Sequence, residues 1–305
     1  MTGTRSKARQ ARSLFSLAGL SWRELGKRVA ASASHDEITG RAAQLAYYFF
    51  AALFPLLLFL TAVLGLIADP QSQLRQQVIS RLTEAMPPSA SGLVQQVVTQ
   101  TSQASGHGKL TIGILLALIS ASAGMGAVFD ALNSAYHLKE TRGFFRRRFL
   151  AMALTIAVSA LVVVATAVIL YGEEIAEWVG SAIHLSGLTV IAWKILQWPV
   201  AIVFLLAAFA LVYYVAPDRR EKHWHWASPG AVIGVLLWLV VSCGLRVYLH
   251  FFNTYSATYG SLGAVMILLL WFYVSGLAVL LGGEVNSVVE AAAAERSQSQ
   301  AAGKA

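Results

Sequence analysis

The side chains best suited to catalysis in this sequence are its seven histidines, because metal-dependent hydrolysis needs histidines and carboxylates in a cluster. Only His223 and His225 lie close together, with Asp218 and Glu221 nearby. That group could hold a metal ion, although the same residues are typical of a solvated segment beside an apolar run. The single cysteine, Cys243, excludes a disulfide framework and a cysteine-based metal site. We therefore expect no enzyme activity and no metal or other cofactor.

A second pattern pairs carboxylates with amides. Two long apolar runs each end in a carboxylate followed closely by Asn-Ser, and two arginines could lie at the same depth. The candidate cluster consists of Arg41, Asp130, Asn133, Arg142, Glu284 and Asn286. One hypothesis is a polar cluster at the mouth of a helix bundle, in which the acids pair with the arginines. Ordinary capping and salt bridging at a boundary explain the same residues, and both interpretations stay open.

Two prolines interrupt apolar runs near the middle. Pro55 and Pro199 each remove one helix hydrogen bond and free a carbonyl one turn earlier, at Ala51 and Ile195. In a membrane helix such a break is tolerated where a neighbour or a cavity satisfies the carbonyl. The two prolines therefore mark a candidate cavity, or packing kinks of the kind that proline causes routinely.

The elements that carry these residues are long and apolar. Charged residues make up 12% of the 305 and apolar residues 57%, whereas soluble domains are about 25% charged. A bilayer core needs about 20 apolar residues of helix, and these runs are far too long for barrel strands. The sequence predicts an all-α, polytopic bundle of six transmembrane helices. They are expected at 42–67, 110–131, 149–171, 189–215, 228–250 and 260–283.

The basic residues predict the orientation of this bundle. Of the 23 Lys and Arg residues, 18 lie before the first run, after the last run, or in the links 132–148 and 216–227. Because Lys and Arg concentrate in cytoplasmic segments, both termini are expected to be cytoplasmic. Arg146, Arg147 and Arg148 are expected to anchor anionic lipid headgroups at that face. The net charge of +8 is then a sign of topology rather than of nucleic-acid binding.

Three regions follow, namely a basic cytoplasmic leader at 1–35, a six-helix membrane domain at 36–290 and a disordered cytoplasmic tail at 291–305. In the leader, residues 14–33 are expected to form an amphipathic helix on the inner leaflet, with Trp22, Leu25 and Val29 on its apolar face. A disordered basic leader is the alternative. The outer loop 68–109 is expected to form two short amphipathic helices that act as a structured cap, or as a gate or docking site.

The predicted membrane interior is nearly free of charge. Carboxylates such as Asp130 and Glu284 lie near the ends of the apolar runs, and none lies near the middle of a run. This distribution argues against a carboxylate proton relay through the core and against a filter of charged side chains. It leaves room for a path taken by an apolar or amphipathic molecule.

Several short motifs occur in a characteristic order along the chain. They are Tyr47-Tyr-Phe-Phe50 in the first run, Ala131-Leu-Asn-Ser-Ala-Tyr136 after the second, Ser228-Pro-Gly-Ala231 at the fifth and Leu281-Gly-Gly-Glu-Val-Asn286 at the end of the sixth. From about residue 36 to 290 the chain resembles the YihY / virulence factor BrkB family of bacterial inner-membrane proteins, some of which carry the older name ribonuclease BN. Histidines scattered over both predicted sides argue against a nuclease.

The resemblance implies a multi-pass protein of the bacterial inner membrane, and it supplies no agreed catalytic or binding residues. Family members are described as virulence factors and as transporters. We therefore expect a transporter or exporter of an unknown small-molecule or lipid substrate, with the bilayer and anionic headgroups as partners and no nucleic acid. The alternative is a non-transporting scaffold that maintains the cell envelope. The sequence names no substrate, direction, energy coupling or oligomeric state.

Overall fold

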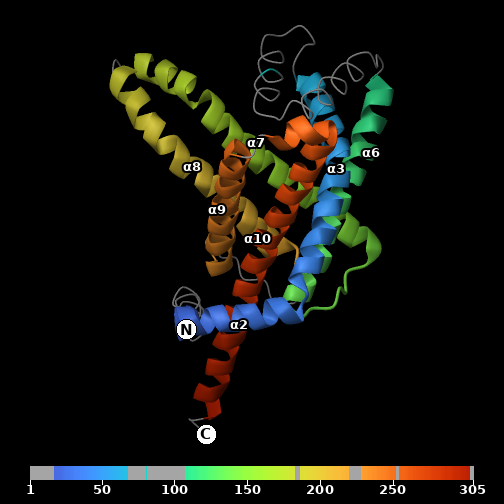
Figure 1. Ribbon diagram of the computed structural model, residues 1–305, viewed down its shortest axis with the longest axis vertical. Coiled ribbons are helices and arrows are strands. Elements are labelled where there is room, and N and C mark those ends of the chain that lie inside the picture. Colours follow the sequence, from blue (N-terminus) through green and yellow to red (C-terminus); the bar gives the residue numbers. More distant parts are fainter. Residues whose placement is uncertain are drawn as a thin grey trace, which may run out of the picture.

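The computed structural model describes residues 17–67, 80, 107–182, 186–219, 228–251 and 254–302, and the elements within them are all helical (Figure 1). After a short 3-10 turn, η1 (Leu17–Gly19), the helices are α2 (Trp22–His35), α3 (Ile38–Ile67), α6 (His107–Ala135), α7 (Phe144–Ala182), α8 (Ser186–Val215), α9 (Pro229–Phe251) and α10 (Thr254–Ala302). Each of the six predicted apolar runs coincides with one long helix, α3 or α6 to α10.

Four of these helices contain apolar stretches long enough to cross a membrane, at Phe144–Ile169, Ala192–Val215, Pro229–Tyr248 and Val265–Gln300. Between 11% and 28% of the residues in the most apolar windows of these stretches are buried within the chain. Several of their large apolar side chains, such as those of Val163 and Val240, are exposed. Outward-facing apolar surface on long helices is characteristic of a membrane protein.

Two helix pairs and a hairpin make up the bundle. The last helix, α10, packs along both α9 and α3, and α3 packs along α6. The α7–α8 pair forms a hairpin whose upper part leans away from α3 and α6 in Figure 1. The main core lies where α6, α8, α9 and α10 converge, around Phe129, Leu132, Val235 and Leu280.

Helix α2 crosses α10 instead of running along it (Figure 1). Its first turn is capped by Ser21, whose hydroxyl accepts a hydrogen bond of 3.2 Å from the backbone N–H of Glu24. Of the predicted apolar face, Leu25 is buried against α10 and Val29 is partly buried there, whereas Trp22 is exposed. Part of the face expected to contact lipid therefore packs against protein.

The tail predicted to be disordered, 291–305, is helical as far as Ala302, and this part of the prediction is corrected. Two causes are evident. Four consecutive alanines begin the tail, and alanine is the strongest helix former. Contacts also fix the helix, since Glu295 pairs with Arg28 at 3.2 Å and Arg296 donates to the Gly19 carbonyl at 2.9 Å.

The candidate cavity prolines both lie inside continuous helices. Pro55 is partly buried in α3, which packs against α6 and α10. Pro199 is exposed in α8, which packs against α7 and α9. The two prolines thus have different helical neighbours. The outer loop predicted at 68–109 lies outside the described residues except for Ser80 and the start of α6.

Two glycines allow α9 and α10 to touch through their backbones. A Cβ atom added at Gly230 would overlap the carbonyl oxygen of Gly282, and one added at Gly282 would meet the carbonyl of Gly230. The nearest obstacle at Gly230 is a backbone atom, so the helices themselves would have to separate, whereas a Cβ atom at Gly282 would first meet the Tyr213 hydroxyl. By contrast, a Cβ atom at Gly244, also in α9, would meet no atom within 4 Å.

The Gly230→Ala variant is expected to lower the thermal unfolding temperature in detergent, because it forces α9 away from α10. The matched Gly244→Ala variant is expected to leave it unchanged or to raise stability by up to about 1 kcal/mol, since alanine has less backbone freedom to lose on folding. Equal unfolding temperatures for the two variants would contradict the backbone contact.

Candidate functional site

Polar side chains gather at the end of the bundle that carries α2, here called the polar end. It is formed by the α2–α3 turn at 36–37, the α6–α7 link at 136–143, the residues that follow α8 and the later part of α10. Two groups lie there. The Arg142 cluster consists of Asn133, Glu140, Thr141, Arg142 and Asp218, and the acid pair consists of Asp36 and Glu284.

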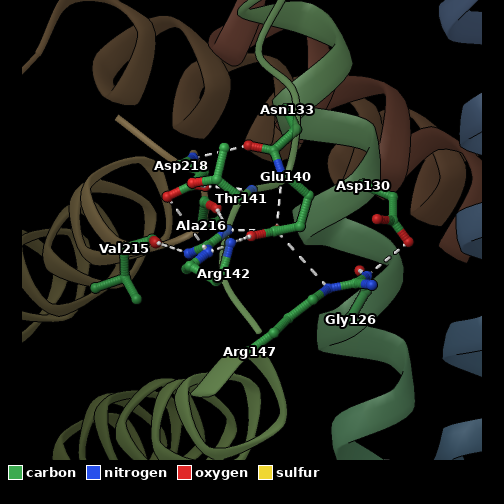
Figure 2. Close-up of polar contacts among 10 residues, drawn as sticks. All are labelled: Gly126, Asp130, Asn133, Glu140, Thr141, Arg142, Arg147, Val215, Ala216 and Asp218. Atoms are coloured by element: carbon green, nitrogen blue, oxygen red, sulfur yellow. Dashed lines mark hydrogen bonds and ion pairs between the residues drawn. The ribbon is translucent and has the colours of Figure 1, made fainter. Parts of the chain in front are cut away.

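All three guanidinium nitrogens of Arg142 donate hydrogen bonds (Figure 2). Nε and Nη2 bind the two carboxylate oxygens of Glu140 at 2.6 and 2.7 Å. Nη1 donates to the Val215 carbonyl at 3.1 Å, and Nη2 also donates to the Ala216 carbonyl at 2.8 Å. The guanidinium also lies 4.8 Å from the centre of the Phe129 ring. The buried charge is therefore paired and hydrogen-bonded, which is what burial of a charge requires.

The rest of the cluster joins the links on either side of the α7–α8 hairpin. Thr141 donates to Asp218 Oδ2 from both its backbone N–H and its hydroxyl, at 2.7 and 2.6 Å. Asn133 accepts from the Asp218 backbone N–H at 2.8 Å and donates to Glu140 at 3.0 Å. Figure 2 shows that these bonds form one closed network. Such a fully satisfied network fixes the geometry of the two links.

The environment of Glu140 keeps its carboxylate ionised. Burial alone would raise the pKa of Glu140, but hydrogen bonds from the side chain and backbone of Arg142, together with its charge, hold that pKa below the ordinary value. The charge of Glu140 is thus part of the folded structure.

The three basic residues expected to anchor lipid headgroups have different surroundings. Arg147 donates to Asp130 at 2.7 Å and to the Gly126 carbonyl at 3.0 Å. Arg148 donates to the Ile119 carbonyl, whereas Arg146 is exposed. Two of the three therefore fasten the start of α7 to α6, and Arg146 remains an exposed candidate for a headgroup.

The acid pair is less well satisfied. The Glu284 side chain is 0% exposed, and among the described residues neither of its carboxyl oxygens has a cationic partner or a hydrogen bond of good geometry. Its polar neighbours are the Ser32 hydroxyl and the Asp36 carboxyl. Asp36 is 7% exposed, and its Oδ2 atom likewise lacks a partner. Two buried carboxyl groups thus face each other without a cation bound to Glu284.

Two exposed histidines connect the acid pair to the surface. His35 Nδ1 lies 3.2 Å from Asp36 Oδ1, and His137 Nδ1 lies 3.6 Å from the same atom. Their side chains are 81% and 59% exposed. Arg41, by contrast, donates to the backbone carbonyl of Asp36 at 2.9 Å and not to its carboxylate. Water therefore reaches imidazoles that touch one side of Asp36, while Glu284 lies buried.

The backbone at His137 has the left-handed conformation, with φ of 52°. It closes α6 by a Schellman motif, in which the His137 N–H donates to the Ser134 carbonyl at 2.8 Å and the Leu138 N–H donates to the Asn133 carbonyl at 2.7 Å. Glycine is the usual residue at this position because it has no Cβ atom. Histidine therefore occupies a strained position, and its ring contacts Asp36.

Two of the sequence motifs meet at the polar end. Asn286 accepts from the Gly230 N–H at 2.8 Å and donates to the Ser228 hydroxyl at 3.0 Å. The start of α9 and the Gly282–Asn286 segment of α10 therefore form one contact. Nearby, Arg219 pairs with Glu290 at 2.7 Å. These bonds hold the segment of α10 that contains the buried carboxyl group.

All six residues of the predicted polar cluster lie at the polar end, but they do not form a single network. Arg142 and Asn133 belong to the Arg142 cluster, and Glu284 belongs to the acid pair. The expected partners are corrected, since Asp130, which is 60% exposed, pairs with Arg147, and Glu284 pairs with no arginine in the part of the chain that the structure describes. Sequence reasoning missed Asp36, Glu140 and His137, and assigned Asp218 only to a possible metal site.

Within the described residues no group of three or more histidine, cysteine and acidic side chains could hold a metal ion. The candidate metal residues His223, His225 and Glu221 lie outside the described residues, and Asp218 binds Thr141 instead.

A family described as Virulence factor BrkB matches residues 29–305. The chain belongs to the BrkB family. It is a membrane protein of that family, with several long apolar helices.

Relatives of this BrkB-family chain have been named differently. It is 36% identical over 252 residues to the ribonuclease-like protein YfkH of Bacillus subtilis, which covers 82% of this chain and 89% of YfkH. It is 30% identical over 265 residues to a UPF0761 membrane protein of Xanthomonas oryzae, and 29% identical over 269 residues to one of Stenotrophomonas maltophilia. Each match covers 84% of this chain but 58% of the relative, so the chain spans less than two thirds of those two proteins. No solved structure matches.

Replacing Arg142 by alanine is expected to destabilise the folded protein by about 3 kcal/mol, because it removes the nearest cation from the partly buried Glu140 and the donors from two carbonyl groups. The matched Arg147→Ala variant is expected to lose less than about 1 kcal/mol, since its partner Asp130 is exposed. Unfolding of both variants in detergent measures the difference. Similar losses would show that the Arg142 cluster does not join the two links.

The low pKa of Glu140 predicts a pH dependence. Because folding lowers this pKa, the carboxylate contributes stability that is fully present above its ordinary pKa of 4.5 and is lost as pH falls through the lower value of the folded state. Unfolding measured from about pH 7 to about pH 3 should therefore show a smaller acid-induced loss of stability for Glu140→Gln than for the unmodified chain. Parallel curves would contradict the assignment.

Proposed function

We propose that this BrkB-family protein is a transporter or exporter of a small or amphipathic molecule in the bacterial inner membrane. Six helices, α3 and α6 to α10, cross the membrane, and the polar end faces the cytoplasm. The concentration of Lys and Arg in the segments at this end supports that orientation. Figure 1 supports the placement of α2 and the end of α10 on the same side.

The observation that supports transport is the burial of Glu284 without a cationic partner among the described residues. An ionisable side chain in a long apolar helix costs several kcal/mol to bury, and it persists where it serves the movement of an ion or a substrate. A purely structural role would be better served by a pairing such as that of Arg142. The Glu284 carboxyl group is therefore the best candidate for a residue that takes part in transport.

A scaffold that maintains the envelope without transport is the second candidate. The closed Arg142 cluster favours it, because a network with every partner satisfied holds the two links in one arrangement. The name of YfkH refers to a ribonuclease-like protein, and that description is of YfkH. We propose no nucleic-acid partner, and we propose that Arg146 contacts anionic headgroups.

Comparing metabolites and lipids among complemented deletion strains tests this function. A strain lacking the gene should show a changed profile of at least one metabolite or lipid, restored by the unmodified gene and by Glu295→Gln. Glu295 lies on the same helix but is exposed, so it is a matched control. Glu284→Gln, produced at the same level in the membrane, should fail to restore the profile.

A scaffold predicts the opposite result, because glutamine fills the space of Glu284 and leaves the helix packing intact. Full restoration by Glu284→Gln would therefore exclude the transport proposal. Pro55→Ala gives a second comparison, since loss of function there without loss of protein would support a working kink in α3.

A further inference from the structure

We infer that Asp36 and Glu284 form a proton-binding site, in which Glu284 carries the proton and Asp36 carries the charge. The inference begins with burial. Glu284 is 0% exposed, Leu280 and Val285 on its own helix are also buried, and the adjoining Gly283 lies against Leu132 of α6. A carboxylate in such a place without a partner is costly, whereas a protonated carboxyl group is neutral.

The second step is the neighbouring acid. The Asp36 carboxyl group faces Glu284, and both are buried. Two adjacent carboxylates repel each other, so one proton is held between them. The Ser32 hydroxyl, on α2, is the neutral polar group beside Glu284. The pair therefore has the composition of a site that binds one proton.

The third step is the charge on each helix packed against the pair. From α3, Arg41 donates to the Asp36 backbone and not to its carboxylate. From α2, Arg28 is engaged with Glu24 and Glu295 on an exposed face. From α9, the groups near this part of α10 are Ser228 and Gly230, which bind Asn286 and are neutral. On the described elements around Glu284, no cation offers it an ion pair.

The fourth step is access from water. His35 and His137 are the titratable groups beside Asp36, and both contact its Oδ1 atom while remaining exposed. Asp36 Oδ2 is buried and has no partner. The two exposed imidazoles therefore lie between water and the Asp36 side of the pair. The left-handed backbone of His137 is consistent with a position kept for its ring.

The site lies at the polar end and not at the middle of a helix, so it is a place where a proton is loaded and released rather than a relay through the membrane core. As the coupling site of a proton-driven transporter, it rests on the proposed function. As a proton-binding site it does not, and it can be tested without a substrate.

Labelling with dicyclohexylcarbodiimide tests the site, because this reagent modifies protonated carboxyl groups in apolar surroundings. Purified full-length protein is treated from about pH 5 to about pH 9, a range above the ordinary pKa of a carboxyl group, and the modified residue is located by mass spectrometry. We expect labelling of Glu284 at low pH that disappears as pH rises. Glu284→Gln should lose that label, and Glu295→Gln should keep it.

Asp36→Asn separates a shared proton from a merely buried acid. Removal of the neighbouring negative charge should move the midpoint of Glu284 labelling to lower pH by about one unit or more. An unchanged midpoint in folded Asp36→Asn protein would overturn the pair. Absence of label on Glu284 at every pH would also overturn it, as would labelling that responds to sodium or divalent ions instead of pH, which would indicate a cation site.

The two proposals fail separately. If Glu284 is labelled as expected but Glu284→Gln restores the metabolite profile, the proton site stands and transport is excluded. If the label is absent but the profile is not restored, transport stands and the proton site is excluded. Equal elution volumes and unfolding temperatures for all variants establish that each is folded.

Discussion

The Arg142 guanidinium binds groups on both sides of the α7–α8 hairpin, and the arrangement of the polar end depends on it. Glu140 lies in the link before α7, while the Val215 and Ala216 carbonyls end α8. The guanidinium therefore closes the base of the hairpin, and Thr141 and Asp218 strengthen the same closure. The upper part of the hairpin leans away from the bundle in Figure 1, so this closure is a principal restraint on its position.

Burial of charge is resolved in two opposite ways at this end of the molecule. Arg142 has a partner for every guanidinium nitrogen, whereas Glu284 has beside it only the neutral Ser32 hydroxyl and the Asp36 carboxyl group among the described residues. Unpaired buried charge is strongly destabilising, so a folded state must either supply a counter-ion or remove the charge. The Arg142 cluster does the first. The acid pair fits the second, and the fixed frame around it keeps Asp36 and Glu284 together.

Hydropathy was sufficient to predict the six long helices, because a run of about 20 apolar residues leaves few alternatives. It could not predict that α2 packs on α10, since an apolar face such as that of Leu25 has the same pattern whether it meets lipid or protein. The helical tail was missed for a related reason. Its stability depends on contacts with Arg28 and Gly19, which lie far away in the sequence.

The candidate residues of the polar cluster lie at one end of the described bundle, but their partners differ from those expected. Pairing depends on which faces the helices turn toward one another. A sequence pattern gives only the position of a residue along its helix. Arg142 pairs with Glu140, two residues away, whereas Asp130 pairs with Arg147. Glu284 lies beside Asp36, which directly follows α2. No sequence pattern around Asp36 predicts this contact. Local motifs such as the closure of α6 at His137 are readable from sequence only where glycine marks them.

The continuity of α10 has a mechanical consequence. At 1.5 Å per residue its 49 residues extend about 74 Å. One continuous helix therefore connects the apolar part of the bundle with the polar end. A twist applied at either end is transmitted along its whole length. The contacts of α2 and η1 with Glu295 and Arg296 restrain rotation of α10 about its axis. Glu284 also lies on α10. A rotation of α10 about its own axis by one residue position, about 100°, would therefore move the Glu284 carboxyl group away from Asp36.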